Sequence, residues 1–282
     1  MKQPLAFETL YNQERGERLH LPPPLDLLLG EFRMPLESHP PYLIGNFVST
    51  LDGVVSLDEA GHEGGGPISG FHPSDQALMG VLRAIADAII VGSRTLHEEP
   101  THKWTAEYIY PDLADTYQEL RRSLGKSERP LNVLVSTSGN LDLSLNLFQE
   151  GTIPVLIVTS TEGEKRLHKQ TIPPSVQIKA CTSEGGMISA SNILHAVQEK
   201  QSGTLYLTEG GPGMLTTFLR DGSLDELFLT LAPQLAGHMP GDTRPSIAMG
   251  HHFAPDQPLW SDLLSVKRVE SHLFLRYAFR KR

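Results

Sequence analysis

Short apolar runs alternate with amphipathic segments along most of the chain, which has 282 residues. The runs are rich in β-branched residues, so each one predicts a buried strand. The segments between them place apolar residues at i, i+3 and i+4, which predicts helices. Strands are expected at residues 42–49, 88–91, 131–135, 155–158, 177–180, 204–208 and 224–232, and helices begin near residues 73, 112, 189 and 214. This alternation predicts α/β layers around a largely parallel sheet.

The C-terminal region departs from this alternation. Residues 263–269 and 272–280 alternate weakly between apolar and polar positions, so they predict an antiparallel hairpin at the edge of the sheet. Residues 58–70 are rich in glycine and predict a mobile loop.

The N-terminal region has mixed signals. Phe7, Leu10 and Tyr11 form an apolar stripe, which predicts an amphipathic helix over residues 4–18, ended by Pro22-Pro23-Pro24. We expect this arm to pack on the main domain or on a neighbouring subunit. The chain is therefore expected to consist of an N-terminal extension, residues 1–40, and one domain, residues 41–282.

Charge and composition exclude several classes of partner. The formal net charge is −9 and no long basic run occurs, so nucleic acid and anionic membranes are not expected partners. The single cysteine, Cys181, excludes an intrachain disulfide and a thiolate metal cluster. His238, His251 and His252 lack a further ligand at suitable spacing, so we expect no metal site. No apolar run approaches the roughly 20 residues of a membrane span, which predicts a cytoplasmic protein.

A glycine-rich turn follows the strand expected at residues 204–208. Glu209-Gly210-Gly211-Pro212-Gly213 leads directly into an amphipathic helix that begins at Met214. A helix N-terminus has unpaired backbone N–H groups and a positive dipole end, which together bind phosphate. The simpler alternative is that these glycines only form a tight strand-to-helix connection.

Similar turns follow other predicted strands. Gly92-Ser93-Arg94-Thr95, Ser136-Thr137-Ser138 and Thr159-Ser160 each come directly after an apolar run. Ligands of open α/β sheets bind beyond the carboxyl ends of the strands, so these turns together indicate a nucleotide cofactor. The first predicted strand lacks the G-x-G-x-x-G signature, which disfavours an ordinary Rossmann dehydrogenase.

Several segments, in this order, resemble the reductase domain of riboflavin biosynthesis, a family related to the C-terminal half of bifunctional deaminase-reductases. The matching segments are Ser49–Gly53, Leu82–Thr95, Glu209–Pro212, Leu224–Leu227 and Ala232–Gly237, and the resemblance covers residues 41–279. It implies a dihydrofolate reductase-like fold, with three αβα layers, a mostly parallel mixed sheet and a C-terminal antiparallel hairpin. It also implies a homodimer.

The resemblance implies NADPH as the cofactor and a ribosylamino-pyrimidine phosphate as the substrate, with hydride transfer reducing the ribosylamino group. It places the pyrophosphate at Gly211, Pro212, Gly213, Met214, Leu215 and Thr216, and other cofactor contacts at Gly92, Ser93, Thr95, Glu98 or Glu99, Ser136 and Thr137. It assigns the substrate to Arg83 and Glu209, with Lys103 as a further candidate. Glu209 and Asp52 are the candidate catalytic residues.

The chain departs from the family pattern after Pro100. Thr101-His102-Lys103-Trp104-Thr105 stands where the family has Leu-Thr-Val-Arg, so the arginine for the substrate phosphate is absent. Lys103 offers a charge but not bidentate geometry. The zinc deaminase signature is also absent. An alternative function is therefore a family member that binds NADP(H) and acts on a different small substrate, or serves as a non-catalytic regulatory protein.

Three of the candidate residues also have structural interpretations. Arg83 is placed to form an ion pair with Asp87 or Asp52. Glu209 follows a strand and is placed to accept hydrogen bonds from its own turn. Asp52, in Leu-Asp-Gly, is typical of a turn former. Both interpretations of each residue stay open on the sequence.

Overall fold

The computed structural model describes residues 3–37, 40–183 and 185–280. Residues 1–2 and 38–39 of the expected extension 1–40, and residues 184 and 281–282 of the expected domain 41–282, therefore lie outside the described part. The described residues form one ten-stranded sheet, in the order β1-β11-β12-β10-β4-β9-β5-β6-β7-β8. Its strands are β1 (Glu8–Asn12), β4 (Tyr42–Ser49), β5 (Ala88–Gly92), β6 (Leu131–Val135), β7 (Val155–Ser160), β8 (Val176–Cys181), β9 (Leu205–Thr208), β10 (Glu226–Leu231), β11 (Ser261–Val269) and β12 (His272–Phe279). A separate small sheet pairs β2 (Glu17–Arg18) with β3 (Arg33–Met34).

The sheet is parallel from β10 through β4, β9, β5, β6 and β7 to β8. At the other end β12 pairs antiparallel with β10, β11 with β12, and β1 with β11. The structure confirms the mostly parallel mixed sheet and the C-terminal antiparallel hairpin. The continuous apolar runs mark the parallel strands because both faces of such strands are buried.

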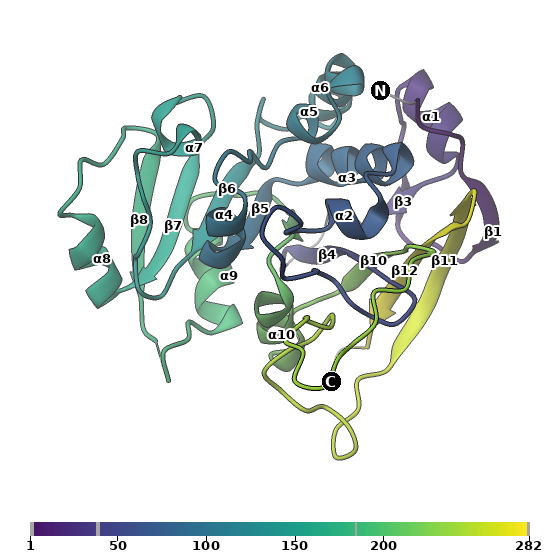
Figure 1. Ribbon diagram of the computed structural model, residues 1–282. Coiled ribbons are helices and arrows are strands. Elements are labelled where there is room, and N and C mark those ends of the chain that lie inside the picture. The colour runs from purple at the N-terminus through teal and green to yellow at the C-terminus, as the bar shows by residue number, and fades with distance from the viewer. Residues whose placement is uncertain (1–2, 38–39, 184, 281–282) are drawn as a thin grey trace.

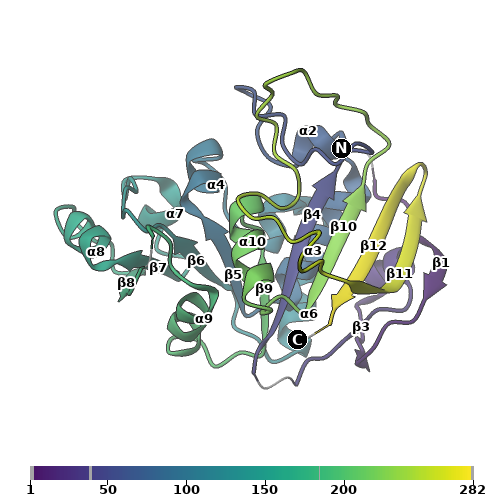
Figure 2. The same cartoon turned by 90° about the horizontal axis from the view of Figure 1, so that it is seen from below.

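Helices cover both faces of the sheet, which gives three layers (Figures 1 and 2). The helices are α1 (Pro23–Leu29), α2 (Gly66–Ser69), α3 (Pro73–Ile85), α4 (Ser93–Glu98), α5 (Ala106–Ile109), α6 (Ala114–Ser123), α7 (Asn146–Gln149), α8 (Thr161–Leu167), α9 (Ala190–Gln198) and α10 (Pro212–Arg220). Ile89 and Val91 of β5 face the core under α3 and α6, whereas Ala88 and Ile90 face the core under α9 and α10. This alternation follows from the two-residue period of a strand. Among the described residues, no helix is long and apolar enough to span a membrane.

The expected helix over residues 4–18 is wrong. Residues Glu8–Asn12 form β1, which pairs with the outer side of β11. Leu10 and Tyr11 are half exposed, so the apolar stripe that favoured a helix is not buried as a stripe. Phe7 is buried, with its ring centroid 4.6 Å from that of Phe274. A short isolated helix is only marginally stable in water. The open edge of β11 instead offers this segment backbone hydrogen-bond partners.

Two further expectations change in the structure. Pro22-Pro23-Pro24 does not end a helix: Pro23 is the first residue of α1, a position that suits the fixed φ of proline. The glycine-rich segment 58–70 contains α2, whose C-cap Gly70 has the left-handed φ of 64°. The division of the chain at residues 40 and 41 stays a prediction.

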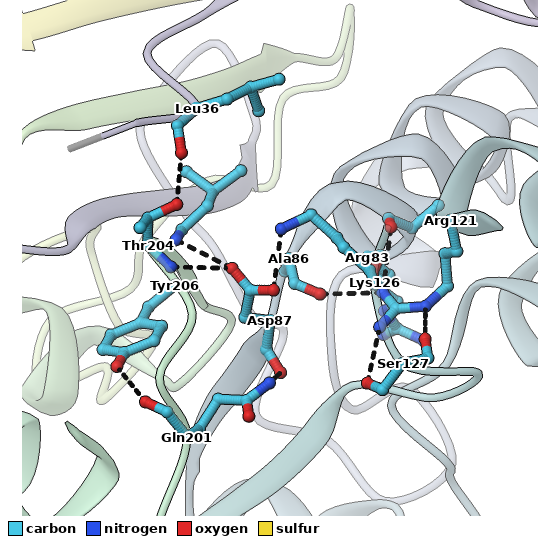
Figure 3. A network of polar contacts seen from close by, with 12 residues as sticks. Leu36, Arg83, Ala86, Asp87, Arg121, Lys126, Ser127, Gln201, Thr204 and Tyr206 are labelled. Carbon is cyan, nitrogen blue, oxygen red and sulfur yellow. Dashed lines mark hydrogen bonds and ion pairs between the residues drawn. The ribbon is translucent and has the colours of Figure 1, made fainter. Parts of the chain in front are cut away.

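A polar network fixes the base of the sheet, at the amino ends of β5 and β9 (Figure 3). Asp87 Oδ2 accepts hydrogen bonds from the backbone N–H groups of Thr204 and Leu205, both at 3.0 Å, and Oδ1 pairs with Lys126 Nζ at 2.8 Å. Arg121 Nη1 donates to the carbonyl oxygens of residues 83, 84 and 86 at the end of α3. The network therefore holds α3, β5 and β9 in register, and the opposite ends of these strands carry the candidate site.

Candidate active site

A cleft of about 620 Å³ opens at the carboxyl ends of the central parallel strands. β9 lies between β4 and β5, and the Glu209 N–H donates to the Ile90 carbonyl at 3.1 Å, so the turn after β9 sits beside the end of β5. The lining residues come from β4 (Asn46, Phe47, Val48), α3 (Asp75, Gln76, Met79, Arg83), the segment 98–104 (Glu98, Glu99, Pro100, Thr101, His102, Trp104) and the turn Glu209–Pro212. This is the edge at which the sequence predicts ligand binding.

Arg83 and Glu209, 126 residues apart, form a buried ion pair at the cleft wall. Arg83 Nε lies 3.0 Å from Glu209 Oε1, and Nη2 lies 2.6 Å from Oε2. Their side chains are only 2% and 8% exposed, so the pair is largely removed from water. The carboxylate partner of Arg83 is Glu209, and not Asp87 or Asp52, which the structural interpretation of the sequence offered as alternatives.

The remaining donors of Arg83 hold the segment after Pro100. Nη1 donates to the carbonyl oxygens of Lys103 and Thr105 at 3.3 and 3.2 Å, and Nη2 lies 2.9 Å from His102 Nε2. A guanidinium has five N–H donors, and all five of Arg83 therefore have protein acceptors. Arg83 thus joins α3, the turn after β9 and residues 102–105 into one rigid wall.

His102 connects this wall to Glu99. Arginine only donates hydrogen bonds, so His102 Nε2 accepts and Nδ1–H donates to Glu99 Oε2, 2.7 Å away. Burial is the main cause that lowers the pKa of His102, and the Arg83 charge acts in the same direction, so the imidazole is neutral. Burial is the largest single influence on the pKa of Glu99 and raises it, but the hydrogen bond from His102 and the electrostatic effects of His102 and Arg83 together outweigh burial and leave the pKa below its usual value. His102 carried no assigned role in the sequence, where the only signal is its place three residues after Glu99.

Asp75 lines the cleft, although the sequence analysis assigns it no role at the site. It lies in the first turn of α3, is 6% exposed and accepts a hydrogen bond at Oδ1 from Thr230 Oγ1 at 2.7 Å. Burial raises its pKa, and hydrogen bonds from Thr230 and Ser69 act in the opposite direction. The helical periodicity of α3 gives no sign that this carboxyl faces a cleft, because that depends on how α3 packs against β10.

Neither Lys103 nor Asp52 is among the described residues that line the cleft, although the Lys103 carbonyl belongs to the wall that Arg83 holds. The Lys103 ammonium pairs with Glu150, with Nζ 2.6 Å from Oε1. Asp52 accepts hydrogen bonds from Thr50 Oγ1 at 2.6 Å and from the N–H groups of residues 236 and 237, and these bonds lower its pKa. Asp52 thus forms the turn that the sequence offers as its structural interpretation. The catalytic and substrate roles of these two residues stay predictions.

The candidate pyrophosphate residues, Gly211 to Thr216, form the N-cap and the first turns of α10. Gly211 is the N-cap and Pro212 the first helical residue, and a Cβ added at Gly211 or Gly213 would meet nothing within 4 Å, so the backbone here faces open space. A Cβ on Gly210 would lie 2.7 Å from the Met214 side chain, so this glycine serves close packing. Such an open helix N-terminus fits a dinucleotide pyrophosphate.

The other candidate cofactor residues have varied surroundings. Thr95 and Glu98 line the cleft. The Ser136 hydroxyl is buried and is one of two such side-chain groups, within the described residues, that form no hydrogen bond. Thr216 Oγ1 accepts from the Met249 N–H at 3.0 Å, and Leu215 belongs to the apolar core under α10. Gly92, Ser93 and Thr137 lie at the ends of β5 and β6. The cofactor contacts of all these residues stay predictions.

The chain also lacks a metal cluster within the part that the structure describes. No group of three or more His, Cys, Asp or Glu side chains there is arranged to hold a metal ion.

Comparisons with known proteins agree with this architecture. The model of the RibD C-terminal domain family matches residues 41–248. Riboflavin biosynthesis protein RibD of Aquifex aeolicus (strain VF5) is 24% identical over 157 residues, which cover 56% of this chain and 38% of that protein. The aligned part thus spans well under half the length of this curated relative.

Solved structures share the fold. A pyrimidine reductase-like protein from Corynebacterium diphtheriae superposes with a TM-score of 0.65 at 21% identity, covering 86% of this chain and 93% of that one. RibD of Acinetobacter baumannii gives a TM-score of 0.60 at 18% identity, covering 85% and 58%. The Saccharomyces cerevisiae riboflavin biosynthesis reductase Rib7 gives 0.58 at 16% identity, covering 85% and 90%.

Proposed function

The chain belongs to the RibD C-terminal domain family, and on this basis we propose that it is an NADPH-dependent reductase of a riboflavin-pathway pyrimidine. The reaction is hydride transfer to the ribosylamino group of the substrate, which becomes a ribitylamino group. The observation that carries the proposal is the cleft at the ends of β4, β5 and β9, which opens beside the N-terminus of α10.

The cofactor half of the cleft is assigned to NADPH, which supplies the hydride when it is bound. Gly211 and Gly213 leave room for the pyrophosphate against the positive end of α10. Thr95 and Glu98 line the part of the cleft where the nicotinamide would lie. Ser136, with its unpaired hydroxyl, and Thr137 would meet the adenosine 2′-phosphate.

The substrate half is assigned to the wall that Arg83 holds together. The Arg83 donors are all engaged, so Arg83 acts by fixing Glu209 and residues 102–105. A carboxylate has about four acceptor positions. Glu209 therefore keeps capacity to accept a hydrogen bond from an amino group of the substrate. Rigid positioning of two ligands is the main contribution that a protein makes to hydride transfer.

The proposal is tested by titrating the purified chain with NADPH and NADH, followed by NADPH oxidation with the ribosylamino-pyrimidine. Gly213→Asp is the test variant, because a Cβ at residue 213 would meet no atom within 4 Å and the added carboxylate brings a negative charge next to the proposed pyrophosphate site. We expect Gly213→Asp to lose NADPH affinity by at least about 100-fold through charge repulsion, whereas Gly213→Ala keeps most of it. Failure of the native chain to bind either dinucleotide would contradict the proposal.

We further propose that the protein is a cytoplasmic homodimer. Leu235, Met239 and Trp260 are more than 70% exposed, and exposed apolar side chains of this size are common at subunit contacts. Light scattering at several concentrations measures the assembly, and a monomer at all of them would contradict the homodimer.

A further inference from the structure

Phe71 is an exposed aromatic residue at the mouth of the cleft. It is 64% exposed, and it is also one of the residues that line the cleft. A single exposed apolar side chain is ordinary on a protein surface. Phe71 differs from exposed residues such as Leu27 and Tyr11 both in its place in the cleft and in the conformation of its backbone.

The backbone at Phe71 adopts a left-handed conformation that bulky residues rarely take. Its φ is 53°, directly after Gly70, whose φ is 64°. A residue with a Cβ is strained in this region, and backbone strain in folded proteins is concentrated at functional sites. Glycine or asparagine would adopt the same conformation at a lower cost. The fold therefore holds an aromatic ring at the cleft at the expense of its own stability.

Contacts on both sides of Phe71 fix the position of its ring. The Phe71 N–H donates to the Gly66 carbonyl at 2.8 Å. The ring lies against α2, because a Cβ added at Gly66 would come within 2.6 Å of Phe71 Cε1. The next residue, His72, is the N-cap of α3. The ring is thus positioned by α2 through packing and by α3 through the main chain, and α3 also carries Arg83.

The position of α3 assigns Phe71 to the substrate half of the cleft. Val81 of α3 and Leu215 of α10 belong to the cores on opposite faces of the sheet. The proposed cofactor site lies at the N-terminus of α10, whereas the wall that Arg83 holds together lies on the α3 side. A second aromatic residue on this side, Tyr108 of α5, is 38% exposed and lines the cleft too. Exposed aromatic rings of this kind stack on planar ligand rings.

We propose that Phe71 is a specificity-determining contact of the substrate, and that its ring stacks on the planar heterocycle of the pyrimidine. The inference rests on the proposed reductase function and adds a residue to the same site. Stacking holds the heterocycle against the wall that Arg83 fixes, while the cofactor binds on the other side of the cleft. Removal of an aromatic side chain that stacks on a base weakens binding by about 5- to 150-fold.

The test measures the two ligands of the cleft separately. The ribosylamino-pyrimidine 5′-phosphate is titrated by calorimetry into the NADP⁺-bound protein, and NADPH is titrated into the free protein. We expect Phe71→Ala to weaken binding of the pyrimidine by at least about tenfold and to change NADPH affinity by less than about twofold. Phe71→Tyr keeps a ring and should stay within about threefold of the native pyrimidine affinity. Tyr11→Ala, which removes an exposed aromatic side chain from β1, outside the cleft lining, is the matched control.

A spectroscopic readout reports on stacking directly. Phe71→Trp places an indole at the same position, and a planar ring that stacks on it quenches its fluorescence. We expect the pyrimidine to quench the emission of Phe71→Trp more strongly than that of the native chain, whose own tryptophans, Trp104 and Trp260, provide the background. Equal quenching in the two proteins would overturn the inference.

A further variant distinguishes stacking from a purely structural role of the ring. Phe71→Gly suits the left-handed backbone, so its melting temperature should match or exceed that of the native protein while its pyrimidine affinity falls as in Phe71→Ala. A lower melting temperature with unchanged pyrimidine affinity would show that the ring only supports α2, which overturns the inference.

The remaining outcomes separate this inference from the reductase proposal. Unchanged pyrimidine affinity in Phe71→Ala overturns the inference, and so does an equal loss of NADPH affinity or a native chain that does not bind the pyrimidine. A native chain that binds the pyrimidine without reducing it contradicts the reductase proposal instead. The binding comparison between the native chain and Phe71→Ala still decides the inference in that case, because it does not depend on turnover.

Discussion

Arg83 and Arg121 are two buried arginines that serve α3 in different ways. They are 1% and 2% exposed, and both form several hydrogen bonds. Arg83 pairs with the Glu209 carboxylate and faces the cleft. Arg121 donates to the carbonyl oxygens of residues 83, 84, 86 and 127 and to the Ser127 hydroxyl (Figure 3). Arg83 therefore balances the Glu209 charge at the site, and Arg121 donates hydrogen bonds to the carbonyl oxygens at the end of α3.

The two guanidinium groups also differ in whether a bound ligand can reach their partners. Burial lowers the pKa of Arg121 to about 10, with Asp87 and Glu107 opposing this at longer range. Most of its acceptors are backbone carbonyls, and by donating to those at the end of α3 Arg121 satisfies acceptors that the helix itself leaves unpaired. The Arg83 partners include a side chain that lines the cleft, so a ligand that contacts Glu209 acts directly on this pair. The main chain of Arg83 joins the two networks, because its carbonyl accepts from Arg121.

The largest expected effect follows from removing the Arg83 side chain. Arg83→Ala leaves Glu209 buried without its partner, and breaking such a pair costs about 3–5 kcal/mol of stability. We expect kcat/KM to fall at least about 100-fold, because Glu209 and residues 102–105 lose their position. Urea unfolding and steady-state kinetics measure the two effects. Arg83→Lys is the matched variant and should recover stability better than activity, since lysine lacks the bidentate geometry. Full activity in Arg83→Ala would contradict the positioning role.

Removing the Arg121 side chain should lower stability but leave activity almost unchanged. Arg121→Met keeps much of the buried volume but leaves carbonyls at the end of α3 unpaired, which costs about 2–4 kcal/mol of stability. The kcat/KM of the folded protein should stay within about threefold of the native value, because the change lies at the far end of β5 and β9 from the cleft. A loss of activity as large as that of Arg83→Ala would show that the two networks are not separable.

The neutral state of His102 predicts how stability responds to pH. Its pKa is lowered in the folded protein, so below its ordinary value of about 6.5 the unfolded chain binds more protons than the folded one. The His102 contribution to the free energy of unfolding is therefore fully present above pH ~6.5 and declines as the pH falls below it. Urea unfolding across this range should show a shallower decline for His102→Gln than for the native protein. Identical slopes would contradict a neutral buried imidazole.

The smallest expected effect concerns Asp75. Its contribution to the free energy of unfolding changes with pH in the opposite direction to that of His102. Its pKa is raised in the folded protein, so its contribution is greatest at low pH and is lost as the pH rises through the folded pKa. Asp75→Asn removes this cost and should raise stability at neutral pH by up to about 1 kcal/mol, offset in part by a weaker Thr230 hydrogen bond. Thermal unfolding at low and neutral pH measures the difference. Destabilisation at neutral pH would indicate that the charged form of Asp75 is favoured in the fold.

The sequence predicts the layers of the fold better than its edges. Residues 42–49 and 131–135 were predicted with the bounds that β4 and β6 have in the structure, because most residues of both strands are apolar and buried. β1 was missed since four of its five residues are exposed and its stability comes from pairing with β11, more than 250 residues away. Local periodicity carries no information about such a distant partner.

In the candidate site, too, the sequence identified residues within motifs but not the contacts between distant segments. Glu209 and Arg83 were identified from their motifs, but their pairing across 126 residues was not, and Asp87 was considered as the partner instead. His102 and Asp75 were given no site role because their chemistry comes from burial and from neighbours on other elements. Lys103 offered a charge of the right sign, and only the structure places its ammonium on Glu150.

The N-terminal strand has a practical consequence for handling the protein. β1 covers the edge of β11 (Figure 1), and Glu14, in the same segment, forms an almost fully buried ion pair with Arg276, with Nη1 3.4 Å from Oε2. A shortened chain that starts at residue 41, where the family match begins, would present an unpaired strand edge beside a buried cation that has lost a partner. Exposed strand edges pair with one another between molecules. Such a truncated protein is therefore expected to aggregate during purification, even with every cleft residue retained.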